Sequence, residues 1–384
     1  MSSAYSRDVY AQLLSLRGHG LPLWEPEPTR FGEVLIGDVG YMQNGGFFRL
    51  FNSILPAEDP VNLGGVPQDY KQLQIPDTLR HHTRHALGAG AICSKGVAAV
   101  NVDASAEVGI GTPLNPLGGI HFKSSEQQGA VLVLKRGADR EMLHDSHTVN
   151  TYILQNHDSW CRFARDVRQL DLKPEDIMFV SGWIKTGPGE WALAATADRG
   201  QDTGITLGGS FGQGIMRASF SFSTPWEHRH GPEGVQEDSE GAKYDQCVFL
   251  NYIKLKRRPL FPLKRLRAAA EPRDLSRSST RDGLDDMIMG DAQALESDED
   301  CTLVEMVPQP SEQGDMVDVM LDYILEQTSA TCAIASDRDV PTLLNSQNQG
   351  DIPENLHQFL TNIRPILIVI DGVGMLSGSN AQER

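Results

Sequence analysis

The stretch QCVFLNYIKLKRR spans residues 246–258 and changes character along its length. Its first half is mostly apolar, and towards its end Ile253 and Leu255 alternate with Lys254 and Lys256. A period of two places alternate side chains on opposite faces of a β-strand. The stretch therefore predicts the last strand of a β-rich body, and the chain leaves that strand through basic residues.

The basic character continues in YIKLKRRPLFPLKRLR, residues 252–267, which contains no acid. Pro259 and Pro262 interrupt this segment, so an extended basic strip is favoured over an amphipathic membrane helix. We predict that the strip contacts acidic lipid or a protein partner. The candidate binding residues are Lys254, Lys256, Arg257, Arg258, Lys264, Arg265 and Arg267.

The formal net charge of −17 is distributed unevenly along the chain. Residues 1–253 hold 21 Lys and Arg against 29 Asp and Glu, and residues 254–281 hold 10 bases against 2 acids. Residues 282–384 hold 20 acids against 3 bases, so they account for the whole net charge. Opposite charges attract over a Debye length of about 8 Å at physiological salt. We therefore predict an intramolecular contact between the basic segment and the acidic tail; the alternative is that both are solvated.

Composition bounds the class of protein. The chain has 384 residues, 40% of them hydrophobic, with 37 Gly and 21 Pro, which favours a β-rich globular body with many turns. Neither a signal peptide nor an apolar run of about 18 residues is recognisable, and the five scattered cysteines form no zinc spacing. We expect a cytoplasmic protein that also acts in the nucleus or at membrane surfaces and is not secreted.

The body shows several strand patterns. Residues 100–110 alternate apolar and polar side chains without error, and residues 120–134, IHFKSSEQQGAVLVL, follow a turn-like GTPLNPLGG. Together these runs predict one long amphipathic hairpin. A helical passage is expected from Asp139 to Arg168, with one apolar face formed by Trp160, Phe163, Ala164 and Val167.

A second antiparallel pair is predicted from IMFVSGWIKT and WALAAT, joined by the turn GPGE at residues 187–190. A further amphipathic strand is expected at residues 216–223. The predicted fold is α+β: a β-rich antiparallel body with amphipathic hairpins and a helical passage, plus a small acidic C-terminal helical module. The expected segments are a body at 1–258, a basic-then-acidic linker at 259–312 and the module at 313–384.

The C-terminal module has a clear helix signal. Asp315 is a plausible N-cap for MVDVMLDYILEQ, and a second helix should begin near Pro353, ahead of the apolar run PILIVI. The first helix presents an apolar stripe opposite its acids. We predict that this stripe docks on a partner surface, which the body of the same chain could supply, through Val317, Met320, Leu321, Ile324 and Leu325.

Motifs for catalysis are weak. GGSFG at residues 208–212 matches G-x-S-x-G, but a hydrolase nucleophile at Ser210 would need a strand-to-helix turn, and a strand is expected next. His81 and His85 would share a helix face as two metal ligands could, yet Arg84 lies between them and no third ligand stands at a diagnostic offset. We expect no enzyme activity, no cofactor and no metal; a serine hydrolase is a remote alternative.

Two resemblances narrow the function. IGDVGYMQNGGFFRLFN at residues 36–52, with FVSGWIKTGPGEWALAA and QCVFLNYIKLKRR, resembles a recurring family of proteins of mushroom-forming (basidiomycete) fungi and implies no particular activity. The order of elements, an amphipathic hairpin, a helical passage, then IMFVSGWIKT, a Gly-rich strand pair and VFLNYIKL, is similar to that of the gasdermin N-terminal domain. That resemblance implies hairpins that insert into a membrane as an oligomeric β-pore, basic residues on acidic lipid, and an inhibitory C-terminal segment.

Two functions therefore stand side by side. One is a gasdermin-like membrane-binding and pore-forming body restrained by the acidic module, with homo-oligomers on the membrane. The other is a soluble protein-interaction or nuclear adaptor, in which the basic segment is an import signal or docking patch and the acidic tail recruits a partner. Sequence-specific nucleic-acid binding is not expected, because the acidic tail would repel phosphate.

Overall fold

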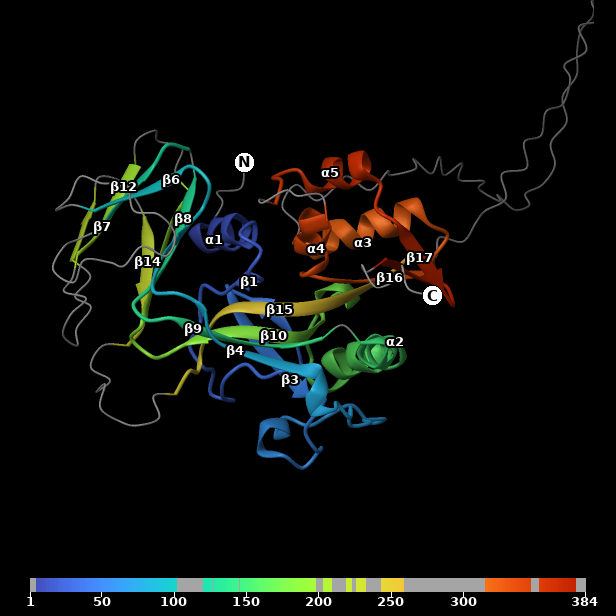
Figure 1. The fold of residues 1–384 in the computed structure, drawn as a ribbon. Helices are drawn as coiled ribbons and strands as arrows, with labels where there is room; N and C mark the ends of the chain where they lie inside the picture. Colours follow the sequence, from blue (N-terminus) through green and yellow to red (C-terminus); the bar gives the residue numbers. More distant parts are fainter. Residues whose placement is uncertain are drawn as a thin grey trace, which may run out of the picture. The chain divides into compact units, whose positions relative to one another are not determined.

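The computed structural model describes residues 5–101, 120–126, 128–144, 146–197, 203–208, 219–222, 226–232, 243–258, 315–346 and 352–377. These residues belong to one compact unit, made of residues 1–258 and 313–384 (Figure 1). Helices accompany a large, mostly antiparallel body of strands, so the predicted α+β class is confirmed. The three-segment division stays a prediction, but the C-terminal segment lies in the same unit as the body.

The main sheet has the order β17-β18-β16-β15-β10-β2-β3 in the described residues, with β9 and β4 continuing from β10 and β1 joining β15. Its strands are antiparallel except for the parallel pair β16–β18. Their bounds are β1 Leu21–Pro22, β2 Asp38–Gln43, β3 Gly46–Asn52, β4 Arg80–Leu87, β9 Ala138–Leu143, β10 Met178–Thr186, β15 Gln246–Arg257, β16 Cys332–Ser336, β17 Leu367–Ile370 and β18 Val373–Leu376.

The strand predicted at the end of the body is confirmed as β15, and it lies at the centre of this sheet. Its first ten residues are buried, which requires apolar side chains on both faces rather than strict alternation. Tyr252 faces one apolar cluster, while Ile253 and Leu255 face another. The strand therefore holds together two cores that lie on opposite faces of the sheet.

Helices cover both faces of the main sheet. Helix α2, His147–Arg162, continues into a π-helical turn at Phe163–Val167 and packs in the cluster of Ile253 and Leu255. Helix α3, Met316–Gln327, packs in the cluster of Tyr252. The remaining helices are α1 Ser6–Ser15, α4 Asp339–Ser346 and α5 Leu356–Ile363, with short 3-10 turns at Pro60–Asn62, Asp77–Leu79 and Pro174–Asp176.

Two hairpins form the rest of the body. The first consists of β5 Gly90–Cys93, β6 Val97–Asn101, β7 Ile120–Ser124 and β8 Gly129–Leu134; the second consists of β11 Trp191–Thr196, β12 Thr203–Gly208, β13 Ser219–Phe222 and β14 Glu227–His230. The hairpins pair with each other twice, β8 with β11 and β7 with β12. Two four-stranded sheets result, β14-β11-β8-β5 and β13-β12-β7-β6 (Figure 1). Helix α1 packs on β8 and β11.

The long hairpin predicted around residues 100–134 differs from the structure in two ways. The run IHFKSSEQQGAVLVL is not one strand, because it breaks between Ser124 and Gly129 into β7 and β8, which lie in different sheets. Residues 102–119 lie outside the described residues. Where β6 pairs with β7, Val100 stands opposite His121 and Asn101 opposite Ile120, so the alternation of β6 is out of phase with that of its partner.

The helical passage begins later than predicted. Ala138–Leu143 is strand β9, because it pairs with β10 on one side and β4 on the other, and this pairing overrides a weak local helix pattern. Trp160, Phe163 and Ala164 are buried as expected, but Val167 is 62% exposed, because the π-helical turn shifts the helical period at this point.

The second predicted hairpin is wrong. Strands β10 and β11 follow each other closely in sequence but pair in different sheets. Both edges of β10 are occupied, by β15 on one side and by β2 and β9 on the other, so β11 has no edge on which to pair. It pairs instead with β8 and β14.

Candidate functional site

The contact between α3 and the basic end of β15 contains three of the seven candidate binding residues, Lys254, Lys256 and Arg258. Lys254 is only 4% exposed, and its Nζ lies 2.5 Å from Asp318 Oδ1 and 3.4 Å from Asp315 Oδ2. The hydroxyl of Tyr252, from the same face of β15, donates to Asp315 Oδ1. Asp315 also caps α3, since its side chain accepts from the backbone N–H of Val317 at 3.1 Å.

The spacing of charges on the two elements matches. Lys254 and Lys256 are two residues apart on a strand, so they point the same way about 6.8 Å apart. Asp318 and Asp322 are four residues apart on a helix, so they share a face about 6 Å apart. Lys256 Nζ therefore meets Asp322 Oδ1 at 2.6 Å, one step along from the Lys254–Asp318 pair. Because the two-residue spacing on β15 matches the four-residue spacing on α3, the Lys254–Asp318 and Lys256–Asp322 ion pairs form side by side.

Arg258 contacts the C-terminal end of α3. Its Nε donates to the carbonyl of Ala330 at 3.0 Å, and its Nη2 donates to the carbonyls of Leu325 and Thr328, the latter at 2.7 Å. The last carbonyls of a helix lack partners within the helix and carry partial negative charge, so a guanidinium there satisfies both needs. The basic strip thus binds both the acidic face and the C-terminus of α3.

Arg257 points to the opposite face of the sheet. Its Nη2 lies 2.9 Å from Asp158 Oδ1 of helix α2, and both side chains are about half exposed. The four candidate lipid- or partner-binding residues in β15 and just after it therefore all make contacts within the chain. Lys264, Arg265 and Arg267 lie outside the described residues.

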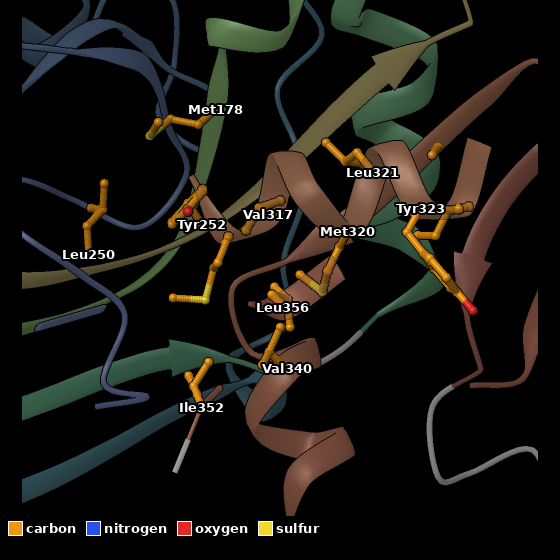
Figure 2. Close-up of a cluster of buried hydrophobic side chains, with 14 of the residues drawn as sticks. Met178, Leu250, Tyr252, Val317, Met320, Leu321, Tyr323, Val340, Ile352 and Leu356 are labelled. Atoms are coloured by element: carbon orange, nitrogen blue, oxygen red, sulfur yellow. The ribbon is translucent and has the colours of Figure 1, made fainter. Parts of the chain in front are cut away.

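An apolar cluster beneath these charges joins α3 to the body. The five residues predicted to dock are buried there, together with Leu250 and Tyr252 of β15 and Met178 of β10 (Figure 2). They are Val317, Met320, Leu321, Ile324 and Leu325. Val340 of α4 and Leu356 of α5 complete the cluster from the outer side. Strand β16 adds backbone pairing with β15 from Ile253 to Arg257.

Asp337 is a further carboxylate at this contact, more deeply buried than Asp315 and Asp318, and the sequence did not indicate it. It follows β16 and accepts from Asn251 Nδ2 at 2.7 Å and from the backbone N–H of Tyr252 at 2.9 Å. Burial raises the pKa of Asp337 to about 6, against the lowering effect of these donors. The only local sign is its place after CAIAS, a run of small residues too short for a clear strand pattern.

The pKa values of Lys254, Asp318 and Tyr252 are shifted by burial and by the charges that these residues and Asp315 place close together. Burial would lower the pKa of Lys254, but Asp315 and Asp318 together raise it above its ordinary value. Burial raises the pKa of Asp318 to about 6, and the charge of Asp315 adds to the increase, because one ammonium group cannot neutralise two carboxylates. Burial and then the charge of Asp315 raise the pKa of Tyr252, so its hydroxyl stays a donor.

The other candidate sites are a serine, a histidine pair and a cysteine–histidine contact. Ser210 lies outside the described residues. His81 and His85 lie on strand β4, not on a helix, and the described residues contain no group of three or more His, Cys, Asp or Glu placed to hold a metal. Helix α2 pairs Cys161 Sγ with His157 Nδ1 at 3.7 Å, but burial raises the pKa of Cys161 to about 11, so the thiol is protonated and a poor nucleophile.

Two further findings bear on function. No helix in the described part of the chain is long and apolar enough to cross a membrane. Comparison with family models, curated proteins and solved structures returned no match. Both resemblances drawn from the sequence therefore stay predictions.

Proposed function

We propose that this chain is an intracellular membrane-inserting protein, similar in action to gasdermins, whose paired hairpins enter acidic membranes once the α3–β15 contact opens. The observation that carries the proposal is the double pairing of the two hairpins. Hairpins that already pair side by side, β8 with β11 and β7 with β12, can extend together as one unit, and no backbone edge between them then meets lipid.

The strand register in the sheet β13-β12-β7-β6 supports membrane insertion. Ile205 of β12 pairs with Phe122 and Phe222, and Leu207 pairs with Ile120 and Phe220. Between them, Thr206 pairs with the polar residues His121 and Ser221. Apolar and polar residues thus form alternate rows across β7, β12 and β13, as a β-sheet between lipid and water requires.

The α3–β15 contact supplies the restraint. While α3 is in place, the ammonium groups of Lys254 and Lys256 are paired with carboxylates, and the guanidinium donors of Arg258 are taken up by carbonyls at the end of α3, so these groups do not bind anionic lipid. Displacement of α3 would uncover these cations and the apolar face around Leu250 and Tyr252 together. A membrane rich in anionic lipid is a surface that suits both.

Dye release from vesicles of phosphatidylserine and phosphatidylcholine tests the proposal. The full chain carries a specific protease site inserted between Arg281 and Asp282, and it is cut after folding so that both parts fold together first. A second variant, Asp318→Lys with Asp322→Lys, places repelling charges against β15. Its matched control, Glu58→Lys with Asp69→Lys, makes the same charge change at two exposed positions away from α3.

We expect the intact chain and the control to leave vesicles closed. The cut chain that also carries the α3 reversal should release dye, and only from vesicles with phosphatidylserine. If that chain neither sediments with such vesicles nor releases dye, membrane insertion is excluded and the soluble adaptor becomes the better hypothesis.

A further inference from the structure

Strand β17 is an edge of the main sheet, as far as the described residues show. In the described residues its only neighbour is β18, so it stands at the end of the strand order. Ile366, just before the strand, is 75% exposed, and Val369 and Ile370 are 43% and 50% exposed. Exposed apolar edges are normally avoided or interrupted by charge, since they pair with other chains. An edge of this kind therefore calls for an occupant.

The backbone of β17 is prepared for a further strand. Ser377 N–H donates to the carbonyl of Ile366 at 2.9 Å, and β17 and β18 pair with Leu367 opposite Leu376. Because hydrogen-bonded and non-hydrogen-bonded pairs alternate in an antiparallel ladder, Ile366, Ile368 and Ile370 bond to β18. The N–H and C=O groups of Leu367 and Val369 then point away from β18, towards the open edge.

We infer that this edge pairs with the same edge of a second copy of the chain, antiparallel and with Ile368 facing Ile368 of the partner. The sequence ILIVI, residues 366–370, is nearly palindromic about Ile368. Antiparallel self-pairing therefore places Ile366 opposite Ile370, and Leu367 opposite Val369, at both ends. The open backbone groups of Leu367 and Val369 meet in this register, which a two-fold axis through Ile368 requires.

The charged residues at the two ends of β17 favour pairing of this edge with a second copy of the chain. Arg364 precedes the apolar run and Asp371 follows it. In the proposed register Arg364 of one copy stands opposite Gly372 of the other, next to Asp371, and the same contact repeats at the other end. No like charges meet along the pairing, because residues 365–370 carry none.

The association should be weak. The exposed apolar area of a few side chains is far below the roughly 800 Å² per partner that a stable interface buries. A concentration-dependent dimer is the expected behaviour, and pairing would be favoured wherever chains are concentrated. The inference does not depend on membrane insertion, since it concerns the folded chain in solution.

Sedimentation velocity of the full chain at rising concentration tests the inference. Ile368→Lys and Ile368→Glu should each abolish the dimer, since like charges would then face across the two-fold axis. An equal mixture of the two variants should restore it, because Lys then faces Glu. Leu63→Lys, at a side chain 82% exposed elsewhere, is the matched control and should leave the dimer unchanged.

Circular dichroism of each variant checks that the fold is retained, which is expected because Ile368 is not among the residues that pack in the cores. A chain that stays monomeric at every concentration would overturn the inference. So would a dimer that survives both single variants, or a failure of the Lys and Glu variants to pair when mixed.

Discussion

Replacement of Asp318 by Asn should stabilise the protein at neutral pH, although it removes an ion pair. Asp318 and Asp315 share the single ammonium group of Lys254, so one carboxylate is in excess in a buried site. Its pKa is about 6 in the folded chain, against 3.8 for an ordinary Asp. The side chain is 25% exposed, so screening by solvent is limited.

The magnitude follows from linkage. A carboxyl whose pKa is raised on folding contributes no penalty well below its unfolded pKa of 3.8, where both states are protonated, and an increasing penalty as the pH rises to about 6. About two pKa units correspond to roughly 3 kcal/mol at pH 7, as an upper limit. Asp318→Asn should therefore gain about 1–3 kcal/mol in the free energy of unfolding at pH 7, and this gain should shrink steadily as the pH falls below 6.

Urea unfolding followed by tryptophan fluorescence, at intervals from pH 4.5 to 7.5, measures this difference. Lys254→Met is the opposite perturbation, because it leaves both carboxylates without the ammonium group and should cost about 3–5 kcal/mol at pH 7. If Asp318→Asn were instead less stable than the wild type at pH 7, with an unchanged pH profile, the second carboxylate would be a net stabilising partner and the reasoning would be refuted.

Three further predictions concern the body. Burial lowers the pKa of His157 to about 4 from 6.5, so acidification from pH 6.5 to 4 should cost the wild type up to about 3 kcal/mol through this residue, and urea unfolding of His157→Gln should show a flatter profile. Gly20→Ala should lower the free energy of unfolding by about 1–3 kcal/mol, because φ of Gly20 is +119° and the new Cβ would lie 2.6 Å from the Leu250 carbonyl oxygen. Gly88→Ala is the control: apart from its chain neighbours, no described residue lies within 4 Å of the added Cβ, so the free energy of unfolding should change by less than about 0.5 kcal/mol. Arg49→Leu should lower the free energy of unfolding by about 3–5 kcal/mol in the same assay. Arg49 binds the carboxylate of Asp38, which is fully buried and would be left without a cation.

Several elements were predictable because their signals are local. The stripe of α3 and its cap at Asp315 appear in the sequence, and the structure confirms helix α3 at Met316–Gln327. The helix expected near Pro353 is confirmed as α5, and PILIVI contains β17. Strand β15 is also confirmed, with Lys254 on one face and Ile253 on the other.

Elements whose state depends on distant partners were not predictable. Ala138–Leu143 is a strand because it pairs with β4 and β10 on its two sides. Strand β16 was not predicted, because its short run of small residues has no strand pattern of its own and pairs with β15 only in the folded chain. The break between β7 and β8 likewise has no strong local sign. In each case the pairing residues lie far along the chain, and no periodic pattern within the segment records them.

The sequence by itself determined where the charges lie, which helix carries an apolar stripe and which strand leaves the body with basic side chains. Those features depend on composition and period, which a short window contains. Only the tertiary structure decided that Lys254 is buried between two carboxylates, that Asp337 lies against β15 and that β17 ends the strand order of the described residues. These outcomes depend on which distant segments meet, and burial, pKa and exposure exist only once they do.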